Sequence, residues 1–177
     1  MCGIIGYAGG KQAAPILLKG LERLEYRGYD SSGIAVIDGA VIRTVKSVGK
    51  IKELAAKTDG GNIPRGVVGI GHTRWATHGV PSDVNSHPHT SQDGKFAVVH
   101  NGIIENFAEL KSELRSRGVK FASETDSEVI AQLLQDVYDG DILDAVRETV
   151  KRLVGSYAVG IVCSDAPDTV FAVRKDN

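Results

Sequence analysis

The alternation of apolar and polar positions near the start of the chain predicts a strand, a helix and a hairpin. Residues 2–8 form a short apolar segment that is typical of a buried strand. The apolar positions that come next follow helical spacing: Ile16, Leu17, Leu18, Leu21 and Leu24. Farther on, the segments 34–37 and 40–45 flank Asp38-Gly39, a dipeptide that favours a hairpin turn.

Two more strands are predicted in the middle of the chain, at 67–73 and 96–100. Between them, residues 74–95 carry Pro81, Pro88 and three histidines, and we expect a loop there. Long loops in compact domains are usually functional, so this segment is a candidate for part of a site.

Three helices and a final hairpin are predicted in the second half. The helical positions are Phe107, Leu110 and Leu114 in the first, Val129, Ile130, Leu133, Leu134 and Val137 in the second, and Ile142, Leu143, Val146, Val150 and Leu153 in the third. Thr125 and Glu128 match a capping box at the start of the second helix. Residues 157–162 and 169–173 then predict the closing hairpin.

Strands, then helices, then strands favour an α+β sandwich in one domain spanning residues 1–177. The alternative is an open α/β sheet. Neither of the glycine-rich nucleotide-binding motifs typical of that class occurs in the sequence.

Composition and charge exclude several classes of function. The 21 Lys and Arg balance 22 Asp and Glu, and no basic run exists, so we expect no nucleic-acid partner. No apolar run reaches the roughly 20 residues that cross a bilayer, so we expect no membrane association. Cys2 and Cys163 lie far apart and outside any C-x-x-C pair, which favours a reducing, cytoplasmic location.

Cys2 is the first candidate for chemistry. Removal of Met1 would leave a thiol and a free α-amine on one residue. An α-amine has a pKa of about 7.7 to 8.0, so it can take the thiol proton and return it to a leaving amine. The alternative is that Cys2 is a small apolar residue of a strand.

Three further positions could bind or polarise a small polar ligand. Arg74 lies in the glycine-bounded segment 71–79 and could hold a carboxylate with its two-pronged guanidinium, although a surface arginine is the alternative. Asn101-Gly102 follows a strand and could supply two oxyanion donors, although the same dipeptide is typical of a type I′ turn. Asp126 could hold an ammonium group or simply favour a helix N-terminus.

Histidines in the same segments raise the question of a metal. His72, His87 and His89 are near one another in sequence, but an H-x-H pair without a third ligand at zinc spacing is weak evidence. We therefore expect no metal site.

Six segments together resemble the class II glutamine amidotransferases, whose glutaminase domain is an N-terminal nucleophile hydrolase. The segments, which span nearly the whole chain, are Cys2-Gly3-Ile4-Ile5-Gly6, 26–33 (YRGYDSSG), 72–79 (HTRWATHG), 85–89 (NSHPH), 100–106 (HNGIIEN) and 124–128 (ETDSE). The resemblance implies an αββα four-layer sandwich of two stacked sheets, and hydrolysis of L-glutamine through a thioester.

The resemblance also implies a role for each candidate residue. Cys2 would be the nucleophile and, through its amine, the base, while Asn101 and Gly102 would form the oxyanion hole. Arg74 and Asp126 would hold the carboxylate and the ammonium of glutamine. The remaining residues would line the pocket (Thr77 and His78), gate the path of ammonia (Trp75) or sit in mobile or interdomain parts of the site (Arg27 and His87). No cofactor is implied.

Two features of the chain bear on these expectations. Family members with similar motifs form homodimers and continue into two sugar isomerase domains, so we expect this chain to be a fragment, truncated near the end of the glutaminase fold. Met1 precedes Cys2, and while Met1 is attached the Cys2 nitrogen is an amide that cannot act as a base. A non-catalytic amino-acid-binding module is therefore the rival hypothesis. An acylase of the same superfamily is disfavoured, because Arg74 with Asp126 suits a zwitterion.

Overall fold

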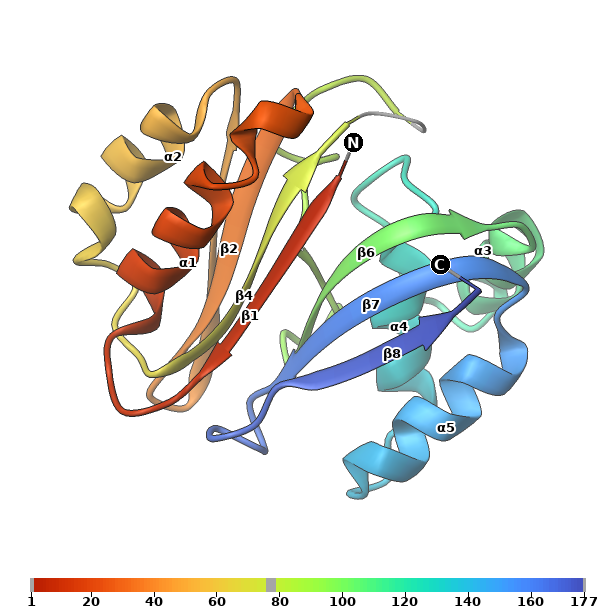
Figure 1. Cartoon of the computed structure of the whole chain (residues 1–177). Coiled ribbons are helices and arrows are strands. Elements are labelled where there is room, and N and C mark those ends of the chain that lie inside the picture. Colours follow the sequence, from red (N-terminus) through yellow and green to blue (C-terminus); the bar gives the residue numbers. More distant parts are fainter. Residues whose placement is uncertain (1, 76–78, 177) are drawn as a thin grey trace.

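Two antiparallel four-stranded sheets form the centre of the molecule (Figure 1). The computed structural model describes residues 2–75 and 79–176. The first sheet has the order β1 (Gly3–Ala8), β4 (Val68–Arg74), β2 (Ser31–Asp38) and β3 (Val41–Val48). The second has the order β5 (His89–Thr90), β6 (Phe96–Ile104), β7 (Gly155–Cys163) and β8 (Phe171–Lys175).

Helices cover the outer face of each sheet (Figure 1). The first sheet is covered by α1 (Ala13–Glu22) and α2 (Ile51–Lys57), and the second by α3 (Phe107–Ser116), α4 (Glu128–Val137) and α5 (Ile142–Arg152). Single 3₁₀ turns lie at Glu25–Arg27 and Asp59–Gly61. Among the described helices, none combines the length and the apolar character needed to cross a membrane.

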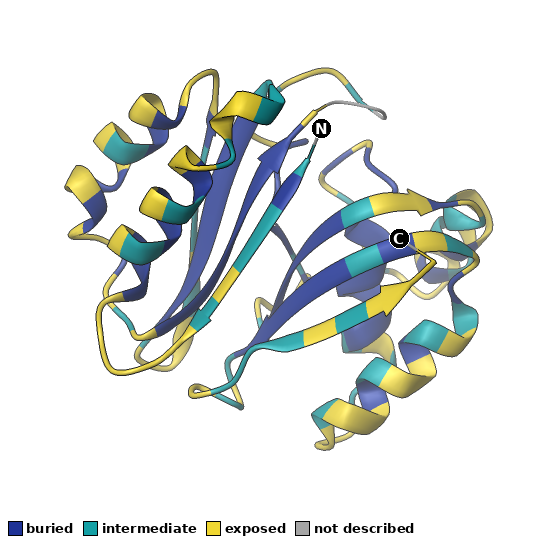
Figure 2. Ribbon diagram, in the orientation of Figure 1, coloured by how far each residue is buried: buried dark blue, intermediate teal, exposed yellow. Residues whose placement is uncertain are grey.

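The apolar core occupies three layers between these elements. The two sheets face each other through small and branched side chains: Ala35, Ile37, Val68 and Ile70 from the first sheet, with Ala97, Val99 and Val162 from the second. Separate clusters lie under α1 and α2, and under α3, α4 and α5. Figure 2 shows that burial is concentrated on the faces between the layers. The predicted αββα sandwich is confirmed.

The predicted elements are found, with local corrections. The loop of the first hairpin is Gly39-Ala40, because Asp38 pairs with Val41, so the predicted turn at Asp38-Gly39 was one residue early. Gly39 has a φ of 64°, which a glycine adopts without strain. The short helix α2 and the two-residue strand β5 were not predicted.

The structure excludes one alternative and shows that one local prediction was wrong. Asn101-Gly102 is not a turn, because β6 continues through it and pairs with β7, Asn101 opposite Ala158 and Gly102 opposite Tyr157. The capping box does not form either. The Thr125 hydroxyl contacts His89 Nε2 at 3.0 Å, and the Glu128 carboxylate accepts from the main-chain N–H groups of Ala122 and Ser123. Ser127 occupies the N-cap position of α4 without a side-chain cap.

Candidate functional site

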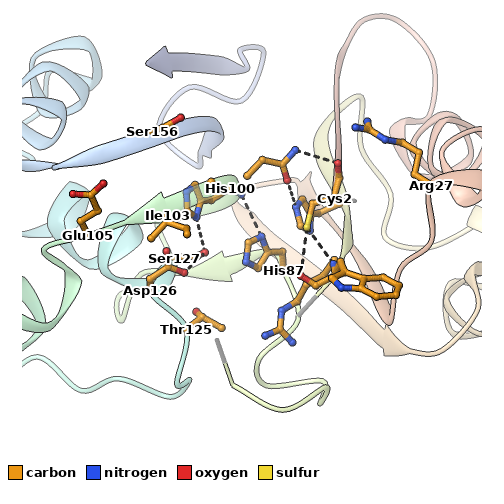
Figure 3. Close-up of a pocket in the computed structure, with 15 residues that line it drawn as sticks. Cys2, Arg27, His87, His100, Ile103, Glu105, Thr125, Asp126, Ser127 and Ser156 are labelled. Atoms are coloured by element: carbon orange, nitrogen blue, oxygen red, sulfur yellow. Dashed lines mark hydrogen bonds between the residues drawn. The ribbon is translucent and has the colours of Figure 1, made fainter. Parts of the chain in front are cut away.

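Pairing of β1 with β4 places Cys2 beside the end of β4. Gly3 lies opposite Thr73 in the register of the two strands, so Cys2 reaches the residues that follow β4. The main-chain N–H of Trp75 donates to Cys2 Sγ at 3.1 Å, and the thiol in turn lies 3.6 Å from the Trp75 carbonyl (Figure 3). The thiol is therefore held beside the main chain of Trp75, the residue that follows β4.

The second sheet brings Asn101 to the same place. Its side-chain Nδ2 donates to the Cys2 carbonyl at 3.4 Å, and its Oδ1 lies 2.8 Å from His72 Nε2 (Figure 3). The next residue, Gly102, has a φ of 119°, and a Cβ there would lie 2.1 Å from the Ser156 carbonyl oxygen. Only glycine fits this position, because the main chain of β7 lies directly beside it.

These residues line one pocket of about 550 Å³ between the two sheets. Of the ten residues predicted from the sequence, eight line it: Cys2, Arg27, Arg74, Trp75, His87, Asn101, Gly102 and Asp126. Thr77 and His78 lie outside the described residues. The pocket is large enough for an amino-acid substrate, and its lining carries a thiol, a guanidinium, a carboxylate and an amide.

Arg74 is held in place at the last position of β4. Its side chain is 5% exposed. Nη2 donates to the Gly79 carbonyl at 3.0 Å, while Nη1 lies 4.0 Å from Asp30 Oδ1. A guanidinium has five N–H donors in a fixed plane, so these contacts set the orientation of that plane.

Asp126 is held by the main chain of β6. Its Oδ2 accepts from the Ile104 N–H at 2.9 Å, and its Oδ1 lies 3.3 Å from the Ser127 hydroxyl. Ser127 also contacts His100 Nδ1 at 2.7 Å. A carboxylate has about four lone-pair sites, so Asp126 can accept further hydrogen bonds from a ligand in the pocket.

Four buried histidines form a cluster at the pocket, and three of them, His72, His87 and His100, line it. The ring of His87 stacks on His72 at 4.2 Å and meets His89 at 4.8 Å and His100 at 6.4 Å. Burial lowers the pKa of His72 from its ordinary 6.5 to about 3, and it lowers the pKa of the other three as well. The rings are therefore neutral near pH 7. Within residues 2–75 and 79–176, no group of three or more His, Cys, Asp or Glu side chains is arranged to hold a metal ion.

His87 differs from what the resemblance implied, because it is 4% exposed and sits inside this cluster. Its Nδ1 accepts from the His100 main-chain N–H at 3.2 Å. Arg27 is half-buried and Trp75 is 55% exposed at the pocket rim. Sequence reasoning assigned no role in the site to His100, Thr125 or Ser127, although all three line the pocket. Their signal in the sequence was their place in the segments 100–106 and 124–128, which carry the family resemblance.

Comparison with known proteins identifies the family. A model described as a glutamine amidotransferase domain matches residues 72–176, a range that includes Arg74, Asn101, Gly102 and Asp126 but begins after Cys2.

Curated relatives match the chain over its whole length. The glutamine–fructose-6-phosphate aminotransferase (isomerizing) of Clostridium tetani is 56% identical over 177 residues, which are 100% of this chain and 29% of that protein. The protein of the same name from Symbiobacterium thermophilum is 57% identical over 98% of this chain and 28% of its own length. The chain therefore spans less than a third of these relatives.

Solved structures agree with the sequence matches. The glutamine phosphoribosylpyrophosphate amidotransferase of B. subtilis superposes with a TM-score of 0.78 at 29% identity, covering 93% of this chain and 35% of that one. An allosteric regulatory enzyme of purine biosynthesis gives a TM-score of 0.80 at 30% identity, over 93% of this chain and 36% of that one. With a shared fold and a family match over more than half its length, the chain belongs to the glutamine amidotransferase domain family.

Proposed function

We propose that this domain hydrolyses L-glutamine to L-glutamate and ammonia through a γ-glutamyl thioester on Cys2. The observation that carries the proposal is the meeting of Cys2 and Asn101, which come from opposite sheets and line one pocket. A thiol and an amide donor side by side are the two groups that acyl transfer from an amide requires.

The first half of the reaction needs Met1 to be removed. The freed α-amine of Cys2 accepts the thiol proton, and the sulfur forms a bond to the side-chain amide carbon of glutamine. Negative charge moves to the amide oxygen, where Asn101 Nδ2 and the Gly102 N–H stabilise it. As the C–N bond breaks, the proton on the Cys2 amine passes to the leaving nitrogen, and ammonia departs.

The second half regenerates the thiol. Water attacks the thioester carbon, the Cys2 amine takes its proton, and the same two donors stabilise the second oxyanion. The C–S bond then breaks, glutamate leaves, and the proton returns to sulfur. The hydrogen bond from the Trp75 N–H to Cys2 Sγ favours sulfur as the leaving group in this step.

Substrate selection is assigned to two charged side chains. Arg74 pairs with the α-carboxylate of glutamine and Asp126 with its α-ammonium, and both already have fixed orientations. Thr77 and His78 belong to the same proposed pocket, Trp75 to the gate through which ammonia leaves, and Arg27 and His87 to its wall.

In the longer protein we propose that the ammonia is used to make glucosamine 6-phosphate from fructose 6-phosphate. Relatives bearing that activity in their name include proteins that are 52 to 57% identical to this chain. The amidotransferases that use phosphoribosylpyrophosphate are the alternative, but the one so named is 29% identical. The partners would then be sugar isomerase domains of the same polypeptide in a homodimer. The proposed compartment is the cytoplasm, where a nucleophilic thiol stays reduced.

The test combines intact mass with ammonia release from glutamine on one sample. Protein lacking Met1 should release ammonia, and Cys2→Ala should abolish release while its circular dichroism spectrum stays unchanged. A variant that keeps Cys2 but retains Met1 should be inactive. It would then only bind amino acids. Folded, processed protein without glutaminase activity would refute the proposal, and so would full activity in Cys2→Ala.

A further inference from the structure

We propose that His72 is a positioning residue that sets the orientation of the Asn101 side-chain amide through the His72 Nε2–Asn101 Oδ1 hydrogen bond. This inference rests on the proposed function, since it gives His72 a task in forming the oxyanion hole. His72 makes the contact at 2.8 Å and is fully buried.

The contact bridges the two sheets. His72 lies in β4, opposite Ile4 on β1 and Gly33 on β2, whereas Asn101 lies in β6 of the second sheet. On its other side the Asn101 amide meets Cys2, with Nδ2 donating to the Cys2 carbonyl at 3.4 Å. His72 and Cys2 thus hold the two ends of one amide group.

The protonation of His72 decides which end faces which partner. The Cys2 carbonyl can only accept a hydrogen bond, so it takes the NH₂ end of Asn101, and Oδ1 is the end that faces His72 Nε2. Because an amide oxygen can only accept, the neutral His72 ring carries its proton on Nε2. An Nε2–H can only donate, and it selects Oδ1 of Asn101. The NH₂ end is then left facing Cys2, as an oxyanion donor must.

Packing keeps the ring in this state. His87 stacks on His72 at 4.2 Å with an interplanar angle of 28°, and His87 itself is fixed by the His100 main-chain N–H. Burial, with the neighbouring Arg74 and His100, opposes a positive charge on His72 and lowers its pKa to about 3. The neutral ring, with its proton on Nε2, is therefore the form present near pH 7.

Without this donor the Asn101 amide can turn over. Its oxygen would then face the developing negative charge. An amide oxygen repels that charge, whereas the NH₂ group stabilises it. Because the loss falls on the transition state, kcat should fall and KM should change little.

The central experiment is a double-mutant cycle on glutamine hydrolysis. His72→Phe keeps a flat buried ring but removes the donor, whereas His72→Gln keeps an N–H donor. His72→Phe should lower kcat by about 10- to 100-fold with KM within about twofold, and Gln should restore part of the loss. Because His72 acts through Asn101, the His72→Phe/Asn101→Ala double variant should be no slower than Asn101→Ala alone.

Thr73→Val is the matched control. Thr73 is the next residue of β4, is fully buried, and has an Oγ1 without a hydrogen-bond partner, so an isosteric change there perturbs the same strand without touching Asn101. It should keep wild-type kcat. Wild-type kcat in His72→Phe, or losses that add in the double variant, would overturn the proposal.

A second measurement does not depend on activity or on the folding of a variant. In ¹⁵N–¹H spectra of the wild-type protein at pH 7, His72 should show a proton on Nε2 and none on Nδ1. A proton on Nδ1 and none on Nε2 would overturn the inference. Absence of ammonia release from processed wild-type protein would instead refute the proposed function, and the spectrum would still test the His72–Asn101 bond.

Discussion

The main-chain N–H of Trp75 donates a hydrogen bond to the Sγ of Cys2, 73 residues earlier in the chain. This bond fixes the position of the sulfur at the edge of the pocket. The bond exists because β1 pairs with β4, and it places the exposed Trp75 ring at the rim of the same pocket. The position of the candidate nucleophile is therefore set by strand pairing in the first sheet as well as by its place near the N-terminus.

Replacing Asn101 with alanine should lower kcat for glutamine by about 100- to 1000-fold while KM changes little, because the lost donor acts mainly on the transition state. Steady-state ammonia release measures both constants. Asn101 lies inside β6, so the variant should remain folded. A KM effect with unchanged kcat would show that Asn101 binds the ground state instead.

Asp126→Asn should weaken the use of glutamine far more than the use of an analogue that lacks the α-amine. Leaving the ammonium unpaired in a closed pocket costs about 2 to 5 kcal/mol, or roughly 30- to 4000-fold in kcat/KM. The comparison between substrates is the control, since Asp126 also accepts from the Ile104 N–H. Equal falls in kcat/KM for the two substrates would show that Asp126 stabilises β6 and its neighbours and does not bind the ammonium.

Gly102→Ala should destabilise the fold by at least about 2 kcal/mol, because a strained φ is combined here with a steric clash. The Cβ would lie 2.1 Å from the Ser156 oxygen. Gly118→Ala is the matched control: its φ is 89°, and a Cβ there meets nothing within 4 Å. Urea unfolding of both variants separates the clash from the strain, and equal losses would contradict the close approach at residue 102.

Stability should fall as the pH drops below about 6.5, because four buried histidines stay neutral in the folded state. Their pKa values are lowered, that of His72 to about 3, whereas the unfolded chain takes up protons near 6.5. As the pH falls below 6.5, each ring therefore lowers the free energy of unfolding by up to about 1.4 kcal/mol per pH unit. The full stability is present only above pH 6.5.

Urea unfolding at pH 7.0, 6.0 and 5.5 measures this slope, above the range in which most carboxylates titrate. His89→Gln should reduce the dependence of the unfolding free energy on pH by the share of one histidine, because glutamine does not titrate. Glutamine can still reach the Thr125 hydroxyl, so the hydrogen bond is kept. A slope unaffected by this change would mean that His89 is protonated in the folded protein.

The order of the strands and helices could be predicted from periodicity. The buried residues of α1 repeat at helical spacing, and β1 is a short, mainly apolar run. Most of the residues that line the pocket could be nominated too, because reactive or charged side chains in short glycine-bounded segments are unusual. Cys2 and Arg74 were nominated in that way and Asp126 from its place at a predicted helix start, and all three line one pocket.

Tertiary structure decided which partner each polar group found. Asn101-Gly102 has the local chemistry of a turn, but β7 supplies a whole strand of pairing partners and extends β6 through it. Thr125 and Glu128 have the spacing of a capping box. In the structure, however, the Thr125 hydroxyl contacts His89, and the Glu128 carboxylate accepts from the main-chain N–H groups of Ala122 and Ser123. Local rules count only the partners available within a few residues, and a buried polar group bonds to whatever the packing of distant segments brings beside it.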